Sequence, residues 1–378
     1  MMKMWKLKLA LLLSPMFCHA QGATPAAAIA LEQQQNWTEA VRVWKAVTLR
    51  NPTDAQAFAS LGVDLARMQR YKEAETAYRK ALRLNSKLQG VELNLGLAEF
   101  KLGEFSSAAI AFRAALAEDP SSLQAQTLLG MSYYGAEKFD LASQYLEPAG
   151  KADPSNAELH EMLAQSCLWA KKLECAEGEF RQLLQQSPHS APTHVLMGEA
   201  LDGLGKTPEA ITEFKTAANI DPREPNVHFG LGYLYWKTQQ YDEAKQEFQR
   251  ELQVDPNSAH ALAYLGDIEW KNNNADAAAP LLEKAIHEKK DLRIPYVDLG
   301  AIYLQQKKYT QAELALDHAV NLDPTVPDAH YQLSRLYQAI GKKAAAEHEL
   351  ARVRQLHEKA DESVAGKMPT AHDSKSDR

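Results

Sequence analysis

Four histidines stand at equivalent places in a 34-residue period, and their spacing could support chemistry. His160, His194 and His228 follow one another at this interval, and His330 falls three periods further on. A row of imidazoles can bind metal ions or respond to pH near neutrality. Metal binding needs several donors that converge on one point, however, and a regular row diverges. We therefore predict no metal site and no cofactor.

Two cysteines, Cys167 and Cys175, lie eight residues apart in the middle of the chain. A disulfide would require their Cα atoms to lie within about 7 Å of each other, which the sequence does not determine. An oxidising compartment would permit the bond, whereas free cysteines commonly serve as small buried apolar residues. We favour two buried free thiols, and the disulfide stays an open alternative.

The sequence lacks the patterns of common catalytic sites. It contains no glycine-rich phosphate loop, no nucleophile elbow and no paired-cysteine zinc spacing. We therefore predict that the protein is not an enzyme.

Residues 1–20 have the composition of a secretory signal peptide. Three lysines open the chain, an apolar run over 9–17 follows, and Ala20 supplies a small residue for cleavage. This run is too short to span a bilayer, and no later apolar stretch reaches about 18 residues. We therefore expect an exported protein without a transmembrane segment, periplasmic or extracellular after cleavage near Ala20. A lipid anchor on Cys18 is an alternative that the bulky Phe17 disfavours.

The charge of the processed chain argues against a nucleic-acid partner. Residues 1–20 contain three of the 42 basic residues and none of the 49 acidic ones, which leaves 39 against 49, a net charge of −10. Affinity for nucleic acid depends on lysines and arginines that neutralise phosphates. We therefore expect no nucleic acid among the partners.

A single repeating period organises residues 21–360 without an insertion or deletion. A small residue recurs at the eighth position of each unit and alanine at the twentieth. The units begin at residues 21, 55, 89, 123, 157, 191, 225, 259, 293 and 327. The eighth positions are Ala28, Gly62, Gly96, Gly130, Ala164, Gly198, Gly232, Gly266, Gly300 and Ser334. The twentieth positions run from Ala40 to Ala346 at the same interval.

This pattern resembles the tetratricopeptide-repeat family, whose unit is a helix–turn–helix of about 34 residues. One unit contains the family's spacing in Leu231-Gly232, Tyr235, Ala244, Phe248 and Pro256. The resemblance covers nearly all of the chain after residue 20. It implies an all-α, right-handed superhelical solenoid of about ten repeats. We expect positions 8 and 20 to face each other where two helices cross, because small residues let the backbones approach closely.

The resemblance also implies where a partner binds. In this family the first helix of each unit lines the concave face, and positions 2, 5, 9, 12 and 13 point into it. Aromatic residues, which dominate recognition energetics, recur there together with lysines at position 13. Trp236 and Trp270 in particular are expected to be exposed. The expected partner-binding residues are Phe100, Lys101, Tyr134, Trp169, Phe229, Tyr233, Trp236, Lys237, Trp270, Lys271 and Tyr331.

These features predict a scaffold that binds a protein or an extended peptide in its concave groove, within a bacterial cell-envelope assembly. The alternative is an accessory subunit that binds or guides polysaccharide by stacking sugar rings on the same aromatic residues. Residues 361–378 are polar and lack the period, so we expect them to form a disordered tail.

Overall fold

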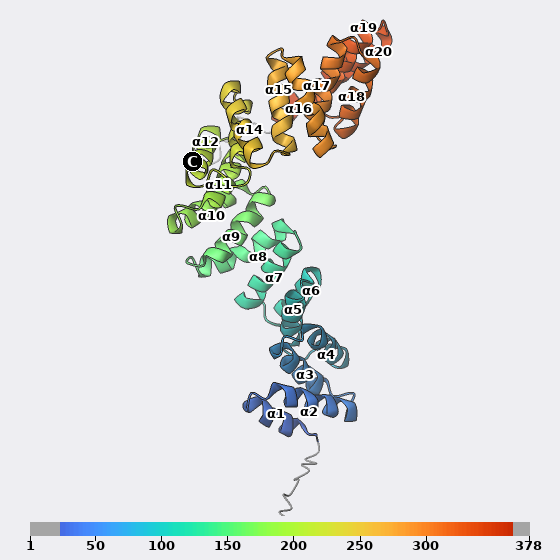
Figure 1. Ribbon diagram of the computed structural model, residues 1–378. Helices are drawn as coiled ribbons and strands as arrows, with labels where there is room; N and C mark the ends of the chain where they lie inside the picture. The colour runs from blue at the N-terminus through green and yellow to red at the C-terminus, as the bar shows by residue number, and fades with distance from the viewer. Residues whose placement is uncertain (1–22, 366–378) are drawn as a thin grey trace, which may run out of the picture. The chain divides into compact units, whose positions relative to one another are not determined.

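The computed structural model describes residues 23–365, and the regular structure of this part of the chain is entirely α-helical. The signal peptide expected over 1–20 and residues 366–378 of the expected tail lie outside the described residues. Twenty helices alternate in two series, one helix of each series per repeat (Figure 1). The predicted all-α helical repeat fold is confirmed.

The first helix of each repeat carries an odd number and the second an even number. The first helices are α1 (Pro25–Gln33), α3 (Ala55–Arg67), α5 (Val91–Lys101), α7 (Leu123–Gly135), α9 (Ala157–Trp169), α11 (Ala191–Gly203), α13 (Val227–Lys237), α15 (Ala259–Lys271), α17 (Arg293–Gln305) and α19 (Pro327–Ala339). The second helices are α2 (Trp37–Arg50), α4 (Tyr71–Leu84), α6 (Phe105–Glu118), α8 (Phe139–Ala152), α10 (Leu173–Gln186), α12 (Thr207–Ile220), α14 (Tyr241–Val254), α16 (Ala275–Glu288), α18 (Tyr309–Leu322) and α20 (Lys343–Ala365).

The helices form two compact units. Unit 1 contains α1–α9 and unit 2 contains α10–α20. Within each unit every helix packs against the next one in the chain, and Figure 1 shows the resulting stack of helix pairs. First helices of neighbouring repeats also touch one another, as α3, α5, α7 and α9 do in unit 1 and α11, α13, α15, α17 and α19 do in unit 2. The first helices therefore form a row in each unit.

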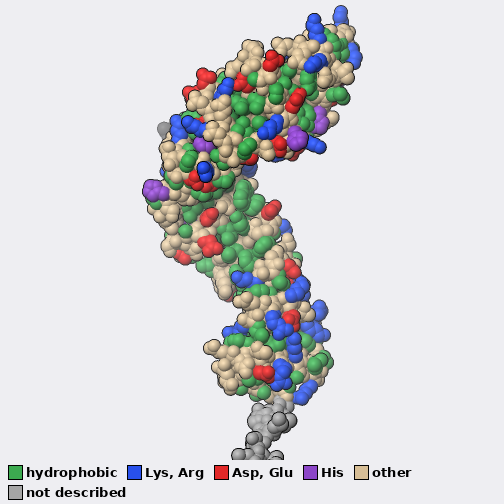
Figure 2. Space-filling view, viewed as in Figure 1, with side chains coloured by type: hydrophobic (Ala, Val, Ile, Leu, Met, Phe, Trp, Pro, Cys, Tyr) green, Lys and Arg blue, Asp and Glu red, His purple; other side chains and the backbone are tan. Residues whose placement is uncertain are grey.

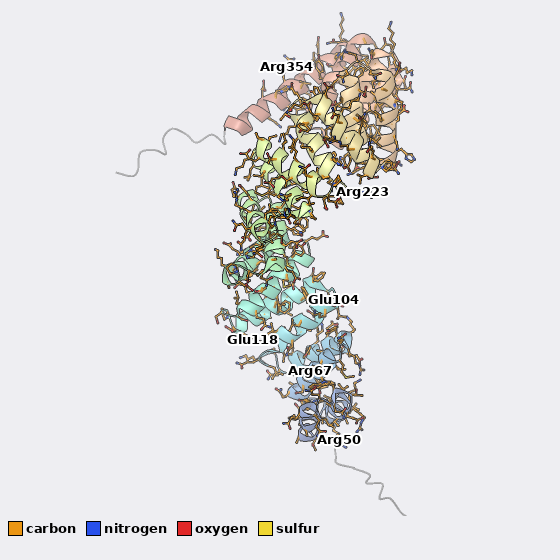
Figure 3. All side chains as sticks on the ribbon, turned by 60° about the vertical axis from the view of Figure 1, so that its left-hand side comes forward. Arg50, Arg67, Glu104, Glu118, Arg223 and Arg354 are labelled. Atoms are coloured by element: carbon orange, nitrogen blue, oxygen red, sulfur yellow. The ribbon has the colours of Figure 1, made fainter. Side chains whose placement is uncertain are left out.

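The second helices begin at the same position of every repeat, from Trp37 to Lys343. Among the first helices, α1 begins at Pro25, four residues later than this period predicts, and α5 and α13 begin two residues later, each after a residue with a left-handed backbone. Gly90 has a φ of 74° and Asn226 a φ of 64°. The amide of Gly90 donates a hydrogen bond of 3.2 Å to the Glu118 carboxylate, a residue that Figure 3 labels.

The glycines at position 8 make room chiefly for a large side chain at position 24, and at Gly266 an added Cβ would also lie 3.5 Å from the backbone oxygen of Ala278 at position 20. A Cβ added to Gly96 would lie 2.7 Å from the ring of Phe112, and one added to Gly62 would lie 2.5 Å from the ring of Tyr78. Both rings occupy position 24 and are fully buried. Because glycine has no Cβ, the large side chain of the second helix fits against the first helix.

Two further expectations are corrected. Cys167 is fully buried, but Cys167 and Cys175 are both disulfide-bonded, so the favoured interpretation of two free thiols is wrong. Residues 361–365 are helical and not part of a disordered tail, because α20 meets no proline or glycine before Gly366 and continues to Ala365. Between residues 23 and 365, no helix is long and apolar enough to cross a membrane.

Candidate partner-binding site

Three aromatic residues of α13 lie on one face of that helix and meet a fourth from α15. Phe229, Tyr233 and Trp236 are spaced four and three residues apart, so they lie above one another on the helix surface. Their ring centroids are 6.4 Å apart for Phe229–Tyr233 and 6.1 Å apart for Tyr233–Trp236. Tyr264 packs edge-on against Trp236 at 4.8 Å. We call these four residues the aromatic cluster.

A pocket of about 430 Å³ lies beside the aromatic cluster on the first helices of unit 2. Phe229 and Tyr233 form one wall, and the nearly buried ring of Phe214 from α12 also lines it. A Cβ on Gly230 would lie 2.3 Å from Phe214, so glycine is required for these two helices to pack here. The polar part of the lining includes Glu199 and Asp202 of α11 and His260 of α15.

Charged groups of both signs lie at the pocket, where Asp202 and the exposed Glu199 line it and Lys237 and Lys289 contact lining residues. Asp202 pairs with Lys237 at 2.6 Å, and this hydrogen bond raises the pKa of Lys237. Burial, together with the nearby charge of Lys289, lowers the pKa of His260 below its usual value of 6.5. His260 is therefore neutral at pH 7, and its Nε2 lies 3.3 Å from the Lys289 ammonium.

Trp236 is held by polar contacts from the following repeat. Its Nε1 donates to the Asp267 carboxylate at 2.5 Å. Lys271 forms an ion pair with the same carboxylate, and its ammonium lies 5.1 Å from the centroid of the Trp236 ring. Both lysines predicted to face a partner from this region, Lys237 and Lys271, are thus engaged within the protein.

Trp270 occupies the same repeat position as Trp236, and both rings are half-buried, so neither is exposed as expected. Trp270 packs against the core formed by Ala278, Leu282, Leu299 and Ile302. Trp236 and Trp270 therefore do not form the single exposed surface that the sequence predicted. The structure instead brings Phe229, Tyr233 and Trp236 together, and Tyr331 lies elsewhere on α19, 49% exposed.

Unit 1 gathers a second, smaller aromatic group from the predicted residues. The ring of Trp169, which is 45% exposed, lies 6.0 Å from Tyr134 and 4.6 Å from Phe139. Figure 2 shows hydrophobic side chains gathered over α7–α9 on the face it views. Phe100 is half-buried against Phe105, with the ring centroids 5.4 Å apart. The adjacent Lys101 is exposed.

Three of the four position-4 histidines link the two helices of their repeat. Nδ1 of His194, His228 and His330 lies 2.5, 2.7 and 2.6 Å from a glutamate carboxylate of the second helix in the same repeat. All three imidazoles are buried. Among the described residues, no group of three or more His, Cys, Asp or Glu side chains could hold a metal ion.

The structure adds residues that the sequence did not single out. His260 stands at position 2, a place that the family resemblance directs into the groove, so a sequence signal for it existed. Tyr264 stands at position 6 and Phe214 at position 24, which are not among the positions expected to point into the groove. Their part in the site depends on how α12, α13 and α15 meet.

Comparisons with known proteins agree with the repeat pattern. Family models described as tetratricopeptide repeat match residues 26–88, 60–123, 100–166, 229–292 and 303–367, and one described as TPR repeat matches 198–239. No curated protein sequence matches the chain. Together the family matches span well over half of the chain.

Several solved structures are similar to this chain. A chain of the APC/C hetero-tetramer Cut9-Hcn1 is 16% identical, with a TM-score of 0.52 over 87% of this chain and 79% of that chain. YrrB, a TPR protein with an unusual peptide-binding site, is 18% identical, with a TM-score of 0.39 over 50% of this chain and 97% of its own. MamA of MSR-1 is 24% identical, with a TM-score of 0.40 over 44% and 96%. On the family matches and the helical-repeat fold, this chain belongs to the tetratricopeptide-repeat family.

Proposed function

We propose that this protein is a non-catalytic scaffold whose unit 2 binds an extended peptide segment of a partner protein across α11, α13 and α15. The observation that carries this proposal is the pocket of about 430 Å³ beside the aromatic cluster. Such a volume falls in the range of sites that enclose a ligand group, and aromatic side chains supply much of the binding energy at protein interfaces. A row of first helices offers a continuous track for the remainder of the peptide.

The ring contacts favour a peptide over a polysaccharide. A sugar ring stacks on an open, flat aromatic face, but the rings of the aromatic cluster pack on one another. Tyr264 lies against Trp236, whose face also receives the Lys271 ammonium. Phe229 contacts Tyr233, Phe248, His260 and Tyr264. What the site offers is a pocket for a side chain, which suits a peptide.

The cellular setting of the proposal is a bacterial cell-envelope assembly. Its support is the signal-peptide composition of residues 1–20. Cell fractionation, with the N-terminus of the mature protein determined by mass spectrometry, tests this part separately. A cytoplasmic protein that retains residues 1–20 would overturn it.

The binding site is tested with a photoreactive residue introduced at position 233 of the full mature chain. We expect crosslinked peptides from one or a few partner proteins, and we expect Phe229→Ala to reduce the crosslinking at least tenfold. Tyr331→Ala is the matched control, because Tyr331 is an exposed aromatic residue on another first helix of unit 2. Circular dichroism verifies that each variant is folded. Equal loss in both variants, or binding to a glycan array that depends on Phe229, would contradict the proposal.

A further inference from the structure

We propose that unit 1 has a second docking site, between α2, α3 and α4, for a peptide segment in which an apolar side chain stands beside an aspartate or glutamate. The site is a pocket of about 400 Å³ with an apolar floor and basic residues at its rim. It lies on other helices than the pocket in unit 2, so the inference goes beyond the proposed function and does not depend on it.

The floor of this pocket is a stripe of apolar side chains on α3. Phe58, Leu61 and Leu65 follow one another at intervals of three and four residues, so they lie on one side of that helix. Ala77 of α4 completes the floor. Leu61, Leu65 and Ala77 are buried, and Phe58 is half-buried. The stripe is about 10 Å long, or roughly two helical turns, and therefore suits one or two apolar side chains of a partner.

Two cations at the rim are available to an acidic partner. Lys80 and Arg83 are three residues apart on α4 and so lie on the same side of that helix. Among residues 23–365, neither side chain forms an ion pair or donates a hydrogen bond, and the Lys80 ammonium lies 5.9 Å from the centre of the Phe58 ring. Figure 2 shows Lys and Arg side chains gathered over α4–α6 on the face that it views. Positive charge thus stands directly beside the apolar floor.

The carboxylate at the rim is already neutralised within the protein. Glu73 is the one acidic residue among the described residues that line the pocket. It accepts two hydrogen bonds of 2.7 Å from Arg70 and forms an ion pair with Lys45 at 3.2 Å. Because Lys45 and Glu73 compensate each other, the rim keeps the positive charges of Lys80 and Arg83.

Arg83 also lines a neighbouring pocket, where the carboxylates interact with a different arginine. That pocket includes Glu92 and Glu99. Glu99 forms an ion pair with Arg79 at 2.6 Å. Burial and the charge of Glu118 raise the pKa of Glu92, and Arg79 is the cation that opposes this rise. The Arg83 guanidinium therefore remains available for a carboxylate of a partner.

These features favour an acidic peptide over other guests. A lysine or arginine of a partner would be repelled by Lys80 and Arg83. An apolar side chain fits the floor, and a carboxylate next to it can accept two parallel hydrogen bonds from Arg83. An anionic membrane surface is held by many cations together. On these helices, however, Lys45, Lys72 and Arg79 are already paired with glutamates, so the available charge is confined to the pocket.

The test uses a random heptapeptide library displayed on phage. The library is depleted on the full mature variant Lys80→Gln/Arg83→Gln and then selected on the full mature wild type, which retains peptides that depend on this pair. We expect these peptides to share a leucine or aromatic residue within two positions of an aspartate or glutamate. In fluorescence anisotropy, replacement of that acid by its amide should weaken binding at least fivefold on the wild type and less than twofold on the variant. Such a cycle isolates the contact between the two groups.

The matched control is Lys87→Gln/Arg113→Gln, which removes two exposed cations of unit 1 that line neither pocket. It should keep the full preference for the acid over the amide, and circular dichroism verifies that each variant is folded.

Three results would overturn the inference: selected peptides without an acidic residue, an effect of the acid that Lys80→Gln/Arg83→Gln leaves unchanged, or a library from which no peptide is selected. Binding to phosphatidylglycerol vesicles that needs Lys80 and Arg83, in place of peptide binding, would overturn it in favour of a membrane surface. None of these results changes the crosslinking at position 233, which tests the proposed function separately.

Discussion

The charge of Asp64 is predicted to make the stability of the first two repeats depend on pH. This carboxyl is 1% exposed on α3, and its Oδ2 has no hydrogen-bond partner within the described residues. Burial, and then the charge of Glu32 on α1, raises the pKa of Asp64 from 3.8 to about 7. Asp64→Asn removes the ionisation and keeps a donor for the Glu32 carboxylate.

The direction and size of the effect follow from these two pKa values. The unfolded chain loses the proton near pH 3.8, whereas the folded unit keeps it to about pH 7. The stability that the neutral carboxyl contributes is therefore complete below pH 3.8 and is lost as the pH rises towards 7. At about 1.36 kcal/mol per pH unit the upper bound is roughly 4 kcal/mol. We expect about 2–4 kcal/mol, because relaxation around a buried charge reduces its penalty.

Amide hydrogen exchange followed by mass spectrometry measures this effect locally, which suits a repeat array whose units open separately. After correction for intrinsic exchange rates, protection of α1–α4 in the wild type should fall as the pH rises from about 4.5 to 7. In Asp64→Asn it should stay constant and exceed the wild type at pH 7. Peptides from α7 and α8 serve as the internal control. The same pH dependence in both proteins, or weaker protection in the variant at pH 7, would refute the reasoning.

Three further predictions concern the walls of the site in unit 2. Gly230→Ala should lower the free energy of unfolding by about 2–3 kcal/mol, because the new Cβ meets the Phe214 ring. Gly205→Ala, at a φ of 75° with open space around it, should cost only about 1–2 kcal/mol. Both are measured by urea denaturation followed by circular dichroism, and a larger cost at position 205 would contradict the packing argument. Phe248→Ala should cost about 3–5 kcal/mol in the same assay, because its fully buried ring packs against Tyr264. If Phe248→Ala abolished binding of the partner peptide without changing the free energy of unfolding, Phe248 would instead be a binding residue. Asp267→Ala should shift the Trp236 emission to longer wavelength, because the indole loses its hydrogen bond and the Lys271 ammonium loses its carboxylate. An unchanged spectrum would show that Asp267 does not position this ring.

The sequence predicts the fold in considerable detail, because the same residue types recur at the same helix-packing positions of every repeat. Alanine at position 20 and small residues at position 8 recur in every repeat, and the second helices begin at the same interval throughout. The late starts of α5 and α13 could not be located from this period. Their connecting segments contain Gly90 and Asn226, whose left-handed backbones became evident only in the structure (Arg223 of the second segment is labelled in Figure 3).

The backbone of the turn inside each repeat was also beyond sequence reasoning. Position 15 has a positive φ in every repeat, yet glycine occupies it in only three of them, at Gly103, Gly205 and Gly341. Other residues, such as Lys171 with a φ of 60°, adopt the same strained conformation. A non-glycine residue stays there only where the packing of the two helices on either side determines the turn.

Some features of the candidate site could likewise be predicted from the sequence, and others became evident only in the structure. The spacing of Phe229, Tyr233 and Trp236 on one helix already determines that they share a face. Whether the side chains on such a face are accessible to a partner depends on the residues of the next repeat that pack against them. Trp236 meets Asp267 there, which accepts its indole N–H, whereas the residue in the corresponding place after Trp270 is the buried, apolar Ala301. Trp270 therefore packs into the core. The sequence by itself determined the period, the helices and the face on which aromatic residues gather, because these depend on local spacing. Only the tertiary structure decided which of those residues stay accessible and which charges are already paired, because these depend on contacts between repeats.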